Sequence, residues 1–215
     1  MQAISEKPVK SARGRPKIFN RERVLDKAMM QFWAYGYEGT SLSHLVDATG
    51  AKAPTLYAEF GNKEGLFRAA MDRYLEVFED LRKGALDQSE YSVSQGIEVY
   101  LRSTARSFTD KSKPAGCFVI CNSMVLAASS TDVAKMLRKQ HHTQEAILET
   151  YLQVRQQRQE LPADVDVSAI ARYLSCLLQG MSVRAREGAT LAELEEIIAT
   201  FMGQWPALTG LTYKG

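Results

Sequence analysis

The sequence has 215 residues, of which 45% are hydrophobic and 24% are charged, and its formal net charge is +2. This length suits one globular unit or two small ones, and the apolar content excludes an intrinsically disordered chain. The sequence contains no apolar run long enough to cross a membrane, no apolar segment of the kind found in a secretory signal, and only three scattered cysteines. We therefore expect a cytoplasmic protein with no membrane association and no disulfide framework.

Basic residues are concentrated at the start of the chain. The first 23 residues contain seven Lys or Arg and two Asp or Glu, whereas residues 66–215 carry 17 basic and 18 acidic side chains. Residues 1–19 lack helical periodicity and include Pro8 and Pro16, so we expect a flexible basic arm. Such an arm either attracts a polyanion or is a solvated leader, and charge alone does not separate these interpretations.

Two helices are predicted after the arm. Asn20 is a suitable N-cap for the first helix, whose apolar residues recur at helical spacing as far as Gly36. A short second helix follows, capped by Thr40 or Ser41, and it ends at Gly50. Gly50 lies in a turn that requires a positive φ angle.

The third and fourth predicted helices complete a characteristic arrangement of short and long helices. The third is short and begins near Pro54, and Asn62 caps a longer fourth helix. Two short helices joined by a glycine-containing turn and braced by a longer helix are typical of a helix-turn-helix, although a hairpin that binds nothing has the same spacing. In a DNA reader, the exposed surface of the third helix would comprise Lys52, Ala53, Pro54, Thr55, Tyr57 and Ala58.

The remainder of the chain also predicts helices. Their expected spans are 92–109, 117–129, 131–159, 166–187 and 190–204, with breaks at the proline-containing segments 111–116 and 160–163. The sequence shows no alternating strand pattern and no repeat. We therefore expect an all-α fold of about nine helices.

Several segments resemble the TetR family of bacterial transcriptional regulators. The strongest likeness covers about residues 14–75, and beyond residue 80 the likeness is one of helix number, length and placement. Its motifs are Gly14-Arg-Pro-Lys17, Val24-Leu-Asp-Lys-Ala28, Phe32-Trp33, Gly36-Tyr-Glu-Gly-Thr-Ser41, Pro54-Thr-Leu-Tyr57, Phe60-Gly-Asn-Lys-Glu64 and Leu66-Phe67, with Gly116-Cys117 and Leu178-Gln-Gly180 further on.

The resemblance implies an organisation and a function. It implies a flexible arm over residues 1–19, a helix-turn-helix DNA-binding domain over residues 20–65, and an effector-binding and dimerisation domain over residues 66–215. The expected protein is a homodimeric repressor, which a small organic effector releases from a palindromic operator in double-stranded DNA. A repressor that senses electrophiles or oxidants through cysteine is the alternative.

The resemblance also implies which residues contact DNA. Tyr57 and Lys63 look like family residues that contact phosphate. Glu59 departs from this pattern because its charge repels phosphate, so it points away, accepts from a cytosine amine or pairs with a base. The arm either enters a minor groove or attracts DNA only non-specifically. The expected DNA-binding set is Arg13, Arg15, Lys17, Thr40, Ser41, Ser43, Lys52, Ala53, Pro54, Thr55, Tyr57, Ala58 and Lys63.

The expected effector pocket combines apolar bulk with a few polar tips. No cluster of carboxylates or arginines demands a charged ligand, so we expect a medium-sized, partly aromatic organic molecule. Each position is also compatible with plain core packing. The expected lining is Tyr74, Phe78, Tyr100, Phe108, Cys117, Phe118, Cys121, Met124, Val125, Leu137, His141, Tyr151, Cys176 and Gln179.

The cysteines and histidines raise two further hypotheses. Cys117 and Cys121 are four residues apart, and Cys117 opens a predicted helix, where the positive end of the helix dipole favours a thiolate. They form a reactive sensor or are two small core residues. His141 and His142 are adjacent and point in different directions on a helix, and no zinc-like ligand spacing occurs, so we expect no metal and no cofactor.

The last two predicted helices carry apolar residues at three- and four-residue spacing. They form either a symmetric dimer surface, where Gly180 would allow close helix crossing, or an internal core pair. The expected dimer interface is Ala169, Tyr173, Leu177, Gly180, Met181, Arg184, Leu191, Leu194, Ile198 and Phe201.

Two other functional classes agree less well with the sequence than a regulator does. An enzyme would need a nucleophile-base constellation or a metal site, but the chain lacks G-x-S-x-G, a phosphate loop and H-E-x-x-H, and it has three histidines. A helical adaptor that binds only proteins does not account for the basic arm or for Lys52 and Lys63 beside the short helices. We therefore expect a regulator, not an enzyme.

Overall fold

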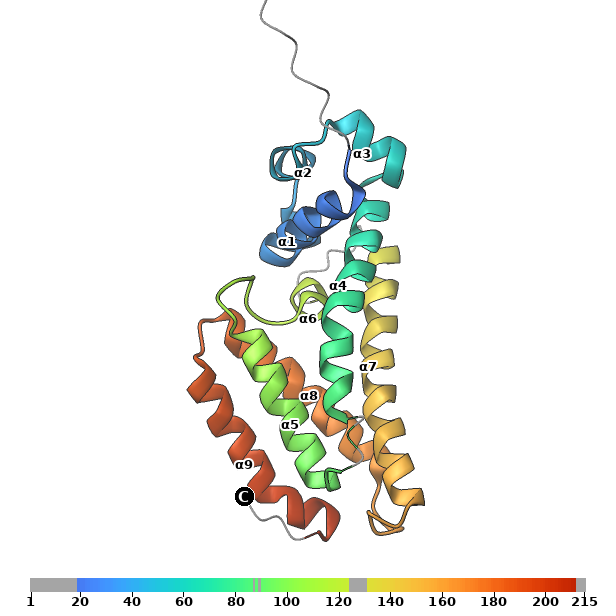
Figure 1. Ribbon diagram of the computed structural model, residues 1–215, viewed down its shortest axis with the longest axis vertical. Coiled ribbons are helices and arrows are strands. Elements are labelled where there is room, and N and C mark those ends of the chain that lie inside the picture. Colours follow the sequence, from blue (N-terminus) through green and yellow to red (C-terminus); the bar gives the residue numbers. More distant parts are fainter. Residues whose placement is uncertain (1–18, 87, 89, 124–130, 212–215) are drawn as a thin grey trace, which may run out of the picture.

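The computed structural model (Figure 1) describes residues 19–86, 88, 90–123 and 131–211, and these residues form nine helices without any strand. The predicted all-α class is thereby confirmed. Among the described residues, no helix is both long enough and apolar enough to span a bilayer. The helices are α1 (Arg21–Gly39), α2 (Leu42–Thr49), α3 (Ala53–Phe60), α4 (Lys63–Leu86), α5 (Val93–Phe108), α6 (Phe118–Ser123), α7 (Thr131–Gln157), α8 (Val167–Arg186) and α9 (Leu191–Thr209).

The molecule is elongated, with a small head at one end and a larger helical body (Figure 1). Helices α1 to α3 form the head, and α4 runs from the head along the body beside α7. Helices α5, α8 and α9 pack together in the body, while the short α6 lies where the head meets it. The head is therefore connected to the body by one long helix and by the contacts around α6.

Local capping explains where the first helices begin and end. Asn20 caps α1, because its side-chain oxygen accepts from the backbone N–H of Arg23 at 2.9 Å. Ser41, not Thr40, caps α2. Gly50 ends α2 in the left-handed conformation, with φ at 69°, which confirms the turn expected there.

Two helices in the body differ from their expected spans. Helix α9 continues past the expected end at residue 204, because Trp205 and Thr209 extend its buried face as far as the left-handed Gly210. The structure describes a helix only over Phe118–Ser123 of the expected span 117–129. Met124 and Val125 lie outside the described residues.

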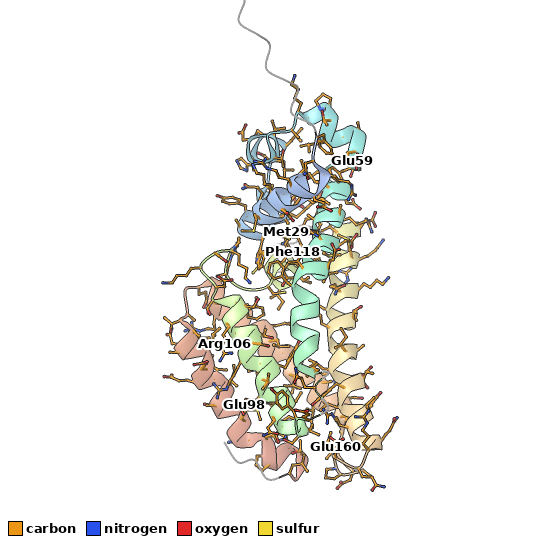
Figure 2. The ribbon with its side chains drawn as sticks, viewed as in Figure 1. Met29, Glu59, Glu98, Arg106, Phe118 and Glu160 are labelled. Carbon is orange, nitrogen blue, oxygen red and sulfur yellow. The ribbon has the colours of Figure 1, made fainter. Side chains whose placement is uncertain are left out.

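An aromatic cluster joins the head to the body. The Trp33 ring of α1 lies edge-on to the rings of Tyr74 and Phe78 of α4, with centroids 5.0 and 5.4 Å apart, and 6.5 Å from that of Phe118 of α6. Figure 2 labels Phe118, which lies where the head meets the body. Because these side chains belong to one buried core, the head and the body are continuously packed.

Candidate nucleic-acid interface

Helix α3 is held by very few side chains. Leu56 is its one buried residue, with 1% of its surface exposed, and it anchors the helix to the head. The end of α3 also packs closely on the start of α4, since a Cβ atom at Gly65 would collide with the Phe60 carbonyl oxygen. Most of the expected recognition surface faces outward as a result: Lys52, Pro54, Thr55, Tyr57 and Ala58 are exposed, and Ala53 is half-buried.

The start of α2 adds small polar groups to the same end of the molecule. Ser41 and Ser43 are exposed, and their hydroxyl oxygens lie 2.8 Å apart. His44 completes a capping box, because its backbone N–H donates to the Ser41 hydroxyl and its ring nitrogen accepts from the Ser41 backbone N–H. His44 carries no recognisable capping signal in the sequence, since a capping box ordinarily has Glu or Gln at that position.

Thr40 does not lie on the outer surface, which corrects one expected DNA contact. Its side chain is fully buried, and its hydroxyl donates to the carbonyl oxygen of Gly36 at 2.7 Å. Gly36 interrupts the helical conformation of α1, with φ at 74°, so this carbonyl needs a partner outside the regular helix. Thr40 therefore fixes the turn between α1 and α2 and leaves the outer surface to Ser41 and Ser43.

Lys63 occupies the first turn of α4, next to the head. Its ammonium group lies 4.5 Å from the centre of the Tyr37 ring, a cation–π geometry that holds the side chain in place. Partial burial lowers the pKa of Lys63, and the nearby carboxylate of Glu38 opposes this shift. The lysine is thus a positioned cation at the end of the molecule where α3 is exposed.

Glu59 is paired with a basic side chain within the protein. Its carboxylate accepts from Nε of Arg21 at 2.8 Å, and the guanidinium of Arg21 also lies 5.4 Å from the centre of the Phe60 ring. A second link joins α1 to α2, where Lys27 donates to the Ala48 carbonyl at 2.7 Å. Arg21 and Lys27 thus position the two short helices.

Arg13, Arg15 and Lys17 of the arm lie outside the described residues.

The residues expected to bind an effector lie mostly in the core. Those that are almost completely buried are Tyr74, Phe108, Cys117, Phe118 and Leu137. Tyr100 and Cys121 are slightly exposed. The half-buried ones are Phe78, His141, Tyr151 and Gln179. A groove of about 510 Å³ lies between α4 and α7, but its lining contains none of them. That lining is Arg68, Met71, Asp72, Leu75, Asp132, Lys135, Met136, Lys139 and Gln140.

The geometry of the thiols does not favour a cysteine sensor. Cys117 is fully buried, and its sulfur accepts from the Tyr74 hydroxyl at 3.3 Å. Burial raises the pKa of the Cys121 thiol, with the charge of Arg186 acting in the opposite direction. A reagent would therefore meet two protected thiols, which is the environment of structural cysteines. Among the described residues, no cluster of His, Cys, Asp and Glu could hold a metal ion.

The expected dimer surface divides into buried and exposed residues. Met181, Leu194, Ile198 and Phe201 are buried inside the protomer, which corrects their assignment to an interface, because they form the internal packing of α8 and α9. Leu177 and Leu191 are half-buried. The exposed residues form a stripe along α8, and Cys176 belongs to this stripe, not to a pocket: Ala169, Tyr173, Cys176, Gly180 and Arg184.

Comparison with known proteins agrees with this architecture. Residues 24–70 match the model of the bacterial regulatory proteins of the tetR family. The HTH-type transcriptional repressor ComR of Escherichia coli K12 is 50% identical over 208 residues, which cover 97% of this chain and 99% of ComR. The repressor BdcR of the same organism is 25% identical, over 84% of this chain and 86% of BdcR.

A solved structure of a regulator is also similar to this chain. The TetR family transcriptional regulator CifR, as a cysteine mutant complexed with 26bp double-strand operator DNA, has a TM-score of 0.85 and 32% identity. The match covers 89% of this chain and 100% of that one. This chain therefore belongs to the TetR family of bacterial regulatory proteins.

Proposed function

We propose that this protein is a homodimeric transcriptional repressor that binds a palindromic operator and is released from it by a small organic effector. The observation that carries the proposal is the surface of α3, where every residue but Leu56 is at least partly exposed on a helix that the rest of the head holds in place. ComR and BdcR are both described as repressors, and CifR was solved with operator DNA. An enzyme is not supported, since these relatives are regulators.

In this proposal each part of the head has a separate task. Thr55 and the small residues around it approach base edges in the major groove, where a threonine can donate, accept or contact a methyl group. Tyr57, with 43% of its surface exposed, and Lys63 contact phosphates, which fixes the register of the head on the duplex. Ser41 and Ser43 contact the sugar-phosphate backbone of the DNA beside these residues.

Dimerisation is proposed through the exposed stripe of α8 and the neighbouring outer face of α9. Tyr173 supports this, because it remains 48% exposed although its ring packs on Phe201 of α9 at 5.5 Å. Gly180 leaves room for a second helix, since nothing lies within 4 Å of the position of its missing Cβ. Two heads joined in this way would read two half-sites, as a palindrome requires.

The effector is proposed to act on the aromatic junction between the head and the body. Trp33, Tyr74 and Phe118 connect α1, α4 and α6, so a ligand that displaces α6 or α4 would also move the head. The apolar character of these residues favours an uncharged, partly aromatic molecule.

The proposal is tested by selecting DNA fragments with the purified protein and measuring their binding at several salt concentrations. We expect palindromic fragments. Tyr57→Ala should weaken binding to all of them, because phosphate contacts carry no sequence information. Thr55→Ala should cost about 1–3 kcal/mol, mainly at one base pair in each half-site.

Arg138→Ala is the control, since it removes an exposed positive charge from α7, a helix outside the head. It should leave the affinity for the selected fragments almost unchanged. Unchanged affinity in both the Tyr57 and the Thr55 variants would contradict the assignment of this surface. Failure of the wild-type protein to select any DNA would contradict the proposed function itself.

A further inference from the structure

The C-terminal end of α1 is capped by side chains that come from the body. A helix leaves its last carbonyl groups without partners inside the helix. Here the carbonyl of Phe32 accepts from the side-chain amide of Asn122 in α6 at 3.2 Å, and the carbonyl of Ala34 accepts from Nη2 of Arg186. The carbonyl of Gly36, where the helical conformation is interrupted, accepts from Thr40 within the head.

Arg186 links three parts of the molecule through one guanidinium group. It is the last residue of α8, its Nη2 donates to Ala34 in α1, and its Nη1 donates at 3.5 Å to the carbonyl of Ala115 in the segment before α6. Its positive charge also lies at the C-terminal, negative end of the α1 dipole. An arginine suits this position because its fork of fixed donors can reach two carbonyl groups at once.

The segment before α6 is itself fastened to α8. The backbone N–H of Cys117 donates to the Ser182 hydroxyl at 2.8 Å. Gly116 has φ at 79°, and a Cβ there would lie 2.7 Å from the Ser182 carbonyl oxygen, so the segment before α6 touches the backbone of α8. The end of α8, the start of α6 and the end of α1 therefore form one connected unit.

We propose that Arg186 is a positioning residue that fixes the orientation of the DNA-binding head relative to α8, independently of the covalent link through α4. This inference rests on the proposed function, in which α8 forms the dimer contact. Each head of a dimer is then held by α4, by the aromatic junction and by the cap on α1. Loss of the cap frees the head to tilt while the buried aromatic junction keeps the protomer folded.

This role predicts relaxed discrimination between operator spacings. Adding or removing one central base pair moves a half-site by about 3.4 Å and by roughly a tenth of a turn. Heads with a fixed orientation resist that change, whereas freer heads follow it. A residue that only stabilised the fold would lower the affinity for every spacing equally.

The experiment uses the palindrome selected by the wild-type protein and two versions with one central base pair added or removed. Arg186→Ala and Arg186→Gln should reduce the spacing penalty by about threefold to tenfold, because a charged hydrogen bond at the surface is lost. Arg186→Lys should give an intermediate result, since an ammonium group cannot span both carbonyls as well. Arg106→Ala, an exposed arginine in the last turn of α5 (Figure 2), is the control and should keep the wild-type penalty.

Hydrogen exchange in the free protein provides a second measurement. Amides in residues 32–40 should exchange faster in Arg186→Ala than in the wild-type protein or in Arg106→Ala. A wild-type spacing penalty in Arg186→Ala, with or without a uniform loss of affinity, would overturn the inference. If the wild-type protein binds no palindrome, the proposed function fails instead, and unchanged exchange at the end of α1 would then overturn the role of Arg186.

Discussion

The helices α3 and α8 are attached to the protein in opposite ways. Helix α3 buries one residue, Leu56, whereas α8 buries nine along its length. A helix as short as α3 has little stability of its own, and burying one leucine contributes only about 1.5–3 kcal/mol. The position of α3 therefore depends on its neighbours, through the Arg21–Glu59 pair and the close contact at Gly65, while α8 is fixed by the core.

Because of this difference, assembly and DNA affinity should respond to different substitutions. The exposed face of α8 can change without loss of the protomer fold, because the opposite face holds the helix. The exposed face of α3 is accurate only as long as α1 and α4 hold their places. We therefore expect assembly to be disturbed by substitutions on the surface of α8, and DNA affinity to be disturbed also by buried substitutions far from the DNA.

The largest expected effect is on assembly. Gly180→Trp should convert the proposed dimer to monomers, since the indole would be added to the exposed stripe at a position where no atom of the protomer lies within 4 Å of the new Cβ. Operator affinity should fall by at least about two orders of magnitude, because one head then binds one half-site without its partner. Analytical ultracentrifugation and DNA binding measure the two effects.

The control for assembly is Gly84→Trp in α4. Gly84 is also exposed, and nothing lies within 4 Å of its missing Cβ, so the same side chain is added to a helix outside the proposed interface. This variant should remain dimeric. An unaltered dimer in Gly180→Trp would place the interface elsewhere.

The next largest expected effect is on stability, through the buried hydroxyl group of Thr40 in the head. Thr40→Val removes the donor to the Gly36 carbonyl and should lower the free energy of unfolding by about 1–3 kcal/mol. Thr40→Ser keeps the hydroxyl and should retain most of this stability. Chemical denaturation measures both. If Thr40→Val were as stable as wild type but bound DNA poorly, Thr40 would contact DNA after all.

The head and the helices α8 and α9 also differ in how much of their structure the sequence predicts. Capping signals and glycine turns identified the head helices, since Asn20, Ser41 and Gly50 act through neighbours close in sequence. Periodicity identified α8 and α9 but could not tell which apolar face meets the core, so Met181 and Phe201 were assigned to the wrong side. Both faces of these helices have apolar residues, and only tertiary packing decides between them.

The coupling between regions was not predictable from spacing. Asn122 offered one signal, an amide inside the apolar run of α6 whose side chain must find a partner when buried. Arg186 offered none, because its acceptors are more than 70 residues away in the chain. Long-range contacts of this kind follow from the assembled fold.

A smaller effect sharpens the description of the α8 surface. Cys176 is exposed on the protomer, whereas Cys117 and Cys121 are buried. A thiol reagent should therefore modify Cys176 several-fold faster in the monomeric Gly180→Trp variant than in the dimer, and should leave the other two thiols protected in both. Mass spectrometry of the native protein after short exposure identifies the modified cysteine. Rapid modification of Cys117 would revive the sensor hypothesis.

The smallest expected effect concerns pH and the contact between α6 and α7. His141 shares a hydrogen bond with Ser123 at 2.9 Å, and burial, together with the nearby His142, lowers the pKa of His141 below its ordinary value of 6.5. The unfolded chain therefore binds a proton more readily than the folded protein, and stability should fall as the pH drops below that ordinary value. His141→Gln keeps a polar partner for Ser123 but does not titrate, so its melting temperature should fall less than that of the wild-type protein between about pH 7.5 and about pH 5.5. His142→Gln, at an exposed position, should keep most of the wild-type pH dependence. An equal fall in the wild-type protein and in His141→Gln would assign the pH dependence to other groups.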